Sequence, residues 1–76
     1  MGDLAQALAD LEEKKVYELV DEKIKQGVNV LNIIQECNTG MVRVGELFSE
    51  GTYFISQLIF SAEILNYSFA LLTPIG

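Results

Sequence analysis

The 76 residues of this chain, half of them hydrophobic, are enough for one small domain and too apolar for a disordered segment. The 11 acidic and 5 basic residues give a net charge of −6, which argues against nucleic-acid binding, because that function needs a cationic surface for phosphate groups. The single cysteine excludes an internal disulfide and favours a reducing cytoplasm, and the absence of histidine excludes the serine-protease and thiol-protease types of catalytic site.

Two amphipathic helices are predicted in the first third of the chain. Asp3 is the expected N-cap of the first, whose apolar face has the three- and four-residue spacing of Leu4, Ala7, Leu8 and Leu11. Asp10 is the expected N-cap of the second, with an apolar face formed by Val16, Leu19, Val20 and Ile24. Its many charged residues are expected to be solvated. Gly27 is expected to end it in a left-handed conformation.

A long third helix is predicted to begin at Asn29, its expected N-cap, and to end at Gly51. Two glycines lie inside it, and a bend is expected around Gly40. Gly45 follows Met41 by one turn, so we expect Gly45 to flatten that face for a neighbouring backbone.

The last predicted helix is almost free of charge, because Glu63 is the single charged residue after position 50. Its expected core stripe consists of Ile55, Leu58, Ala62, Leu65, Phe69 and Leu72. Thr73 and Pro74 are expected to stop it. Polar residues interrupt the apolar run, so we expect no membrane span. The N-terminal residues lack a basic region followed by an apolar core, so we also expect no signal peptide.

The side chains available for chemistry are few. We expect Cys37 to be a small buried hydrophobe rather than a reactive thiol or a ligand, and Glu36, Glu46 and Glu50 to be solvated. The sequence therefore predicts no catalytic residue and no metal site.

Apolar and aromatic residues cluster around Gly51, where the last two predicted helices meet: Phe48, Tyr53, Phe54, Ile55 and Leu58. They could simply close the core of the bundle. Alternatively, they could form a lid over a large flat ligand or a docking surface for a second domain.

The same stretch contains a spaced pattern formed by Gly40-Met41, Val44-Gly45, Leu47-Phe48, Gly51 and Phe54-Ile55. It resembles the helical cap that precedes the cobalamin-binding domain in methionine synthase and in the corrinoid proteins of one-carbon methyltransferases. Ser56 stands where that family has proline. The resemblance implies an all-α fold, a small bundle of about four helices.

In that family the bundle lies over the upper face of the corrin ring and shelters the cobalt-bound methyl group, and it swings away when a methyltransferase approaches. The resemblance therefore implies that Phe48, Ile55 and Leu58 form an apolar lid over the corrinoid. It leaves Phe54 as a core anchor of the turn.

Residues 1–76 are thus expected to be a single helical cap domain, without the family's cobalamin-binding sheet domain and its Asp-x-His-x-x-Gly motif. On its own such a chain is expected neither to hold cobalamin in the family's manner nor to be catalytic. The implied partners are that downstream domain and methyltransferase subunits. Two alternatives remain: an oligomerising regulatory module of a cobalamin-dependent transcription factor, and a plain helical bundle that forms a homodimer through its last helix.

Overall fold

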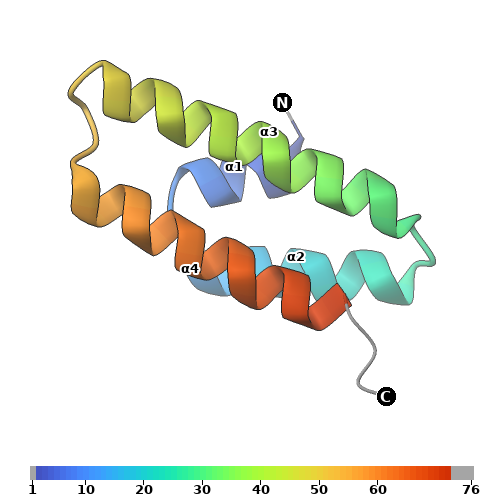
Figure 1. Cartoon of the computed structure of the whole chain (residues 1–76). Helices are drawn as coiled ribbons and strands as arrows, with labels where there is room; N and C mark the ends of the chain where they lie inside the picture. The colour runs from blue at the N-terminus through green and yellow to red at the C-terminus, as the bar shows by residue number, and fades with distance from the viewer. Residues whose placement is uncertain (1, 73–76) are drawn as a thin grey trace.

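Four helices make up residues 2–72, the part of the chain that the computed structural model describes. They are α1 (Asp3–Ala9), α2 (Glu13–Lys25), α3 (Val30–Ser49) and α4 (Ile55–Leu72), and the two long helices, α3 and α4, are joined by a turn at one end of the molecule (Figure 1). The predicted all-α bundle is confirmed. The expected stop at Thr73 and Pro74 lies outside the described residues.

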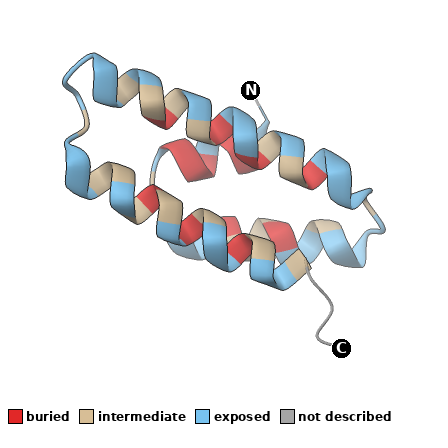
Figure 2. Ribbon diagram, viewed as in Figure 1, coloured by how far each residue is buried: buried red, intermediate tan, exposed pale blue. Residues whose placement is uncertain are grey.

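The short helix α1 occupies the centre of the bundle. Five of its seven residues are buried, and Figure 2 shows them between the other helices. Leu4 and Leu8 pack in one core cluster with residues from every other helix: Val16, Val20, Ile33, Cys37 and Ile64. Leu11, expected on the same helix, follows it instead, with a φ of 60°, and packs against this core from the connecting turn.

Helices α1 and α3 approach each other closely at Gly40, which is buried. A Cβ atom at this position would lie 2.9 Å from the carbonyl oxygen of Ala5 and 3.1 Å from the side chain of Leu8. The expectation that Gly45 receives a neighbouring backbone is wrong, since a Cβ there would meet nothing within 4 Å. The buried residue at that level of α3 is Val44, so Gly45 lies to one side of the packed face.

The predicted helix ends at Gly27 and Gly51 are confirmed. Both glycines have left-handed φ angles, of 78° and 82°. The residue after each donates its amide hydrogen to the carbonyl of the residue five positions earlier, at 3.0 Å and 2.9 Å, which satisfies backbone groups that a helix end leaves free. Asn29 caps α3 as expected, because its side chain accepts a hydrogen bond from Leu31 N at 2.8 Å.

The predicted caps at Asp3 and Asp10 are wrong. Gly2 is the N-cap of α1 and Glu12 that of α2, and neither makes a side-chain capping bond. The α1 amides are instead bonded by Glu36 of α3, whose Oε1 accepts from Leu4 N at 3.0 Å. Asp10 lies at the other end of α1 and accepts hydrogen bonds from the Gln6 side chain.

Glu36 is therefore a half-buried structural residue rather than the solvated one that we expected. Lys23 of α2 lies 3.8 Å from it and 3.5 Å from Asp3, so one cation joins three helices. Hydrogen bonding from Leu4 N lowers the pKa of Asp3, and Lys23 contributes to this shift. The other two acids, Glu46 and Glu50, are exposed beside Arg43, as expected of surface residues.

The expected stripe of α4 is confirmed in part. Leu65, Phe69 and Leu72 are partly buried against the core, whereas Ile55 is exposed. The fully buried residues lie beside this stripe and are Ser61, Ile64 and Ser68. The two serine hydroxyls donate within the helix, to Leu58 O and Ile64 O at 2.7 Å and 2.8 Å, so burial leaves them satisfied. A helix that is apolar around most of its circumference gives little indication of which side is buried.

By length and composition alone α4 would be able to cross a membrane, with a mean hydropathy of 1.3. In the structure it packs against α2 and α3 as part of the bundle. Of its 18 residues, 17% are fully buried there, and Ile55, Ile59, Tyr67 and Leu71 are exposed.

Alanine substitutions at the two glycines of α3 should have opposite effects. Gly40→Ala forces a methyl group against the Ala5 carbonyl, so it should destabilise the fold by about 1–3 kcal/mol, the usual cost of overpacking. Gly45→Ala adds a methyl group in open space and should stabilise the helix by about 0.5–1 kcal/mol. Urea unfolding followed by circular dichroism measures both, and equal effects of the two substitutions would contradict the described contact.

Candidate functional site

The turn between α3 and α4 has a fixed backbone. The amides of Thr52 and Tyr53 both donate to Leu47 O, at 2.9 Å and 3.0 Å. At the start of α4, Phe54 N donates to the side chain of Gln57 at 2.7 Å. The helix thus begins normally at Ile55 without the proline of the related pattern.

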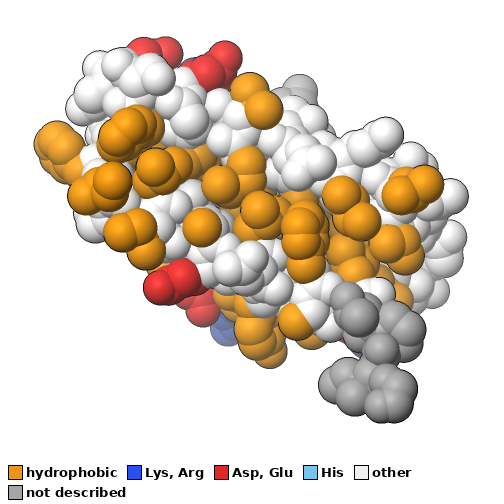
Figure 3. Space-filling view, in the orientation of Figure 1, with side chains coloured by type: hydrophobic (Ala, Val, Ile, Leu, Met, Phe, Trp, Pro, Cys, Tyr) orange, Lys and Arg blue, Asp and Glu red, His pale blue; other side chains and the backbone are white. Residues whose placement is uncertain are grey.

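Large apolar side chains surround this turn on the outside of the molecule. Phe48 is 41% exposed, Ile55 62% and Phe54 68%, and Leu58 beside them is half-buried. Figure 3 shows hydrophobic side chains gathered at this end of the molecule and continuing along α4. We call Phe48, Phe54, Ile55 and Leu58 the turn patch. Contiguous exposed apolar groups of this kind mark interaction surfaces.

The turn patch bears on two sequence-based expectations. Phe48 and Ile55 do not fill the bundle core, which removes the simplest alternative for them. The expectation that Phe54 anchors the turn in the core is wrong, since it is the most exposed of the four. Its neighbour Tyr53 ties the turn to α1 instead, because a half-buried phenol can still donate a hydrogen bond to a backbone carbonyl.

The sequence placed Tyr53 in the cluster around Gly51 but gave no indication of its hydrogen bond to α1. Its hydroxyl donates to the carbonyl oxygen of Ala9 at 2.6 Å, across 44 residues of sequence. Burial raises the pKa of its phenol, the negative charge of Asp10 adds to this, and Arg43 opposes it. A contact between segments so far apart leaves no local signal in the sequence.

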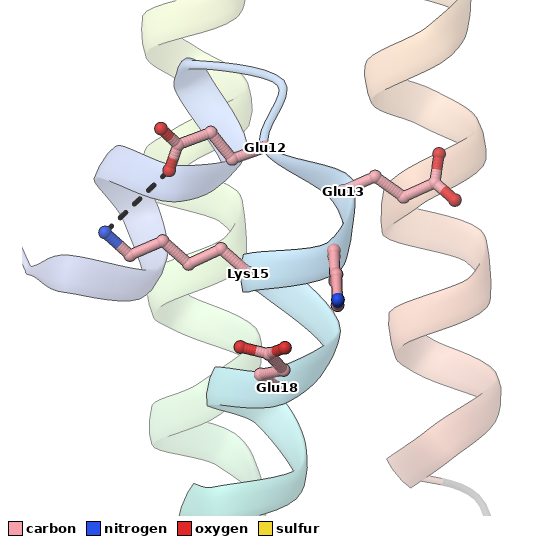
Figure 4. Close-up of a pocket in the computed structure, with 5 residues that line it drawn as sticks. Glu12, Glu13, Lys15 and Glu18 are labelled. Atoms are coloured by element: carbon pink, nitrogen blue, oxygen red, sulfur yellow. Dashed lines mark ion pairs between the residues drawn. The ribbon is translucent and has the colours of Figure 1, made fainter.

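A depression with a different character lies at the start of α2 (Figure 4). It is lined entirely by charged side chains, Glu12, Glu13, Lys14, Lys15 and Glu18, and is open to solvent. Glu12 and Lys15 form an ion pair at 3.8 Å with both side chains at least half exposed. Such pairs contribute little free energy. We interpret this depression as solvated surface, as predicted for the charged face of α2.

The side chains that most often bind metals are scattered over the described part of the chain. No three of the described cysteine, aspartate and glutamate side chains are grouped so that they could hold a metal ion. Cys37 is buried, and burial, with a smaller contribution from Glu36, raises the pKa of its thiol to about 11. A neutral enclosed thiol is a poor ligand. The turn patch offers apolar contact only.

Comparison with known proteins relates nearly the whole chain to one family. A family model described as a B12 binding domain matches residues 2–73. The trimethylamine corrinoid protein of Methanosarcina barkeri is 29% identical over 70 residues, which are 91% of this chain and 32% of that protein. Trimethylamine corrinoid protein 1 of Methanosarcina mazei is 30% identical over 69 residues, 90% of this chain and 32% of the relative.

The chain therefore spans about a third of the length of these curated relatives, at 32% of each. No solved structure matches the chain.

The environment of Cys37 predicts its reactivity. Because the thiol is buried and its pKa is about 11, it should not react with a disulfide reagent at pH 8 in the folded protein, and it should react at once in denaturant. The release of thionitrobenzoate measures both rates. Fast reaction of the folded chain would instead indicate an accessible thiolate and revive the ligand interpretation.

Proposed function

The chain belongs to the B12 binding domain family, and we propose that it acts as the helical cap of a corrinoid methyl carrier in one-carbon transfer. In this role the turn patch covers the upper face of the corrinoid and shelters the methyl group on the cobalt. The cap itself is not a catalyst. It controls access to a group that methyltransferases deliver and collect.

The exposure of the turn patch is the observation that supports this proposal most. Phe48 and Ile55 lie on either side of Gly51, at the ends of two helices whose backbone hydrogen bonds fix the turn between them. Leaving such side chains in water is unfavourable, by about 25 cal/mol for each Å² of apolar surface that a partner would otherwise bury. A flat apolar partner at this end of the bundle would remove that cost.

The chemistry of the patch suits a removable lid. A bound corrinoid supplies the reactive metal that carries the methyl group. Phe48, Ile55 and Leu58 offer no donor, acceptor or charge, so they can exclude water from that face without forming a bond that opposes opening.

The domain that holds the cofactor must then be a separate one, and we propose that it follows this domain in the same protein. The relatives are about three times as long as the aligned region, which leaves room for it. The outward side of α4, with Ile59 and Tyr67 more than half exposed, is the natural surface for contact with this domain and with methyltransferase subunits.

The lid role predicts the effect of truncating Phe48. In this domain joined to a cobalamin-binding domain and loaded with methylcobalamin, Phe48→Ala should increase the rate of aerobic photolysis several-fold, because water and oxygen gain access. Leu31→Ala is the matched control, since it truncates another exposed apolar side chain at the opposite end of α3.

Absorbance spectroscopy follows the reaction, and thermal unfolding verifies that both variants fold. Equal photolysis rates for Phe48→Ala, Leu31→Ala and the unmodified protein would contradict the lid role.

The exposed apolar surface also favours a second candidate, a homodimer through α4. The two candidates differ in what they predict for association. As a cap, the chain alone should self-associate weakly at high micromolar concentration, and Ile55→Gln should abolish this, whereas the chain joined to its cobalamin-binding domain should be monomeric because the surface is covered. Sedimentation velocity distinguishes them. A stable dimer of the joined protein would favour the plain dimerising bundle.

A further inference from the structure

We propose that Tyr53 is a positioning residue, which fixes the orientation of the turn patch by tying the α3–α4 turn to the C-terminal end of α1. This inference rests on the proposed lid function, and it assigns to the lid a residue that does not itself touch the cofactor. Its basis is the 2.6 Å hydrogen bond from the Tyr53 hydroxyl to Ala9 O.

The carbonyl that Tyr53 bonds is the last one of α1. The three carbonyls that precede the Ala9 carbonyl accept hydrogen bonds from backbone amides after the helix: Gln6 O from Asp10 N, Ala7 O from Glu12 N and Leu8 O from Leu11 N. The carbonyl of Ala9, a buried residue, receives the Tyr53 hydroxyl instead. Tyr53 thus completes the cap of the central helix from a segment that is remote in sequence.

Tyr53 is held at its other end by α3. Its amide donates to Leu47 O at 3.0 Å, directly before Phe48 in the sequence. Ile55, which also belongs to the turn patch, follows Tyr53 by two residues. The side chains that we assign to the lid therefore flank a residue that is bonded to both α3 and α1.

The chemistry of this link fits a positioning role. A hydrogen bond to a carbonyl sets both a distance and a direction, which an aliphatic contact does not. A phenol is protonated at neutral pH and able to donate, and burial, which raises the pKa of Tyr53, favours this form further. The ring is half-buried, so phenylalanine can keep the packing and remove only the hydrogen bond.

The first arm of the test uses the 76-residue chain alone, in which Tyr53→Phe removes the hydroxyl. Tyr67→Phe is the control, because it removes the hydroxyl of an exposed tyrosine on α4 whose ring contacts Tyr17. Amide hydrogen exchange measured by nuclear magnetic resonance should become several-fold faster at positions 52 and 53 in Tyr53→Phe. Core amides such as that of Cys37 should be unchanged, and so should every amide of the control. Unchanged exchange at positions 52 and 53 would overturn the inference.

The second arm measures photolysis in the domain joined to a methylcobalamin-loaded domain. Tyr53→Phe should raise the rate several-fold although Phe48 and Ile55 remain in place. If Phe48→Ala raises the rate and Tyr53→Phe does not, Tyr53 is merely structural and the inference is wrong. If Phe48→Ala has no effect, the lid function fails, and the exchange measurement then decides by itself whether Tyr53 fixes the turn.

Discussion

The close contact between α1 and α3 at Gly40 is the constraint on which the rest of this fold depends. It lets a helix of only seven residues lie at the centre of the bundle, with its amides bonded by Glu36 and its last carbonyl by Tyr53. Helix α1 is much shorter than α3 and α4, so it fills only the middle of the bundle. The turn between α3 and α4 extends beyond the end of α1 (Figure 1). The turn patch lies at this turn and is exposed.

This arrangement separates the molecule into two parts with different properties. All charged residues except Glu63 lie before Gly51, on α1, α2, α3 and the adjoining turns, where Lys23 joins three helices and the remaining charges are mostly solvated. Helix α4 carries only Glu63, and its fully buried residues are Ser61, Ile64 and Ser68. In a domain built this way, contacts with the central helix α1 stabilise the fold, and α4 presents apolar side chains at the surface. Both properties suit a cap that must remain folded while it binds and leaves a partner.

The sequence predicted the features that depend on neighbouring residues and missed those that depend on distant ones. Gly27, Asn29 and Gly51 act within their own helix ends, so their roles could be derived from local spacing. Glu36 and Tyr53 bond groups 32 and 44 residues away, and no local pattern indicates such partners. The core-facing side of α4 was predicted only in part: Leu65, Phe69 and Leu72 pack against the core as expected, but two of the three fully buried residues are serines, which an apolar pattern does not indicate. Within the candidate site, the exposure of Phe48 and Ile55 agrees with a surface role, and the position of Phe54 does not agree with a core role.

The most direct test of the account is to find where the cofactor-bearing domain touches this one. An isotope-labelled sample of the 76-residue chain would be titrated with a separately prepared cobalamin-binding domain loaded with methylcobalamin, and amide resonances would be followed. If the turn patch is the lid, the largest shifts should lie between residues 47 and 58, with the charged start of α2 unaffected. Shifts confined to residues 12–18, with the turn unchanged at saturating partner, would contradict the account.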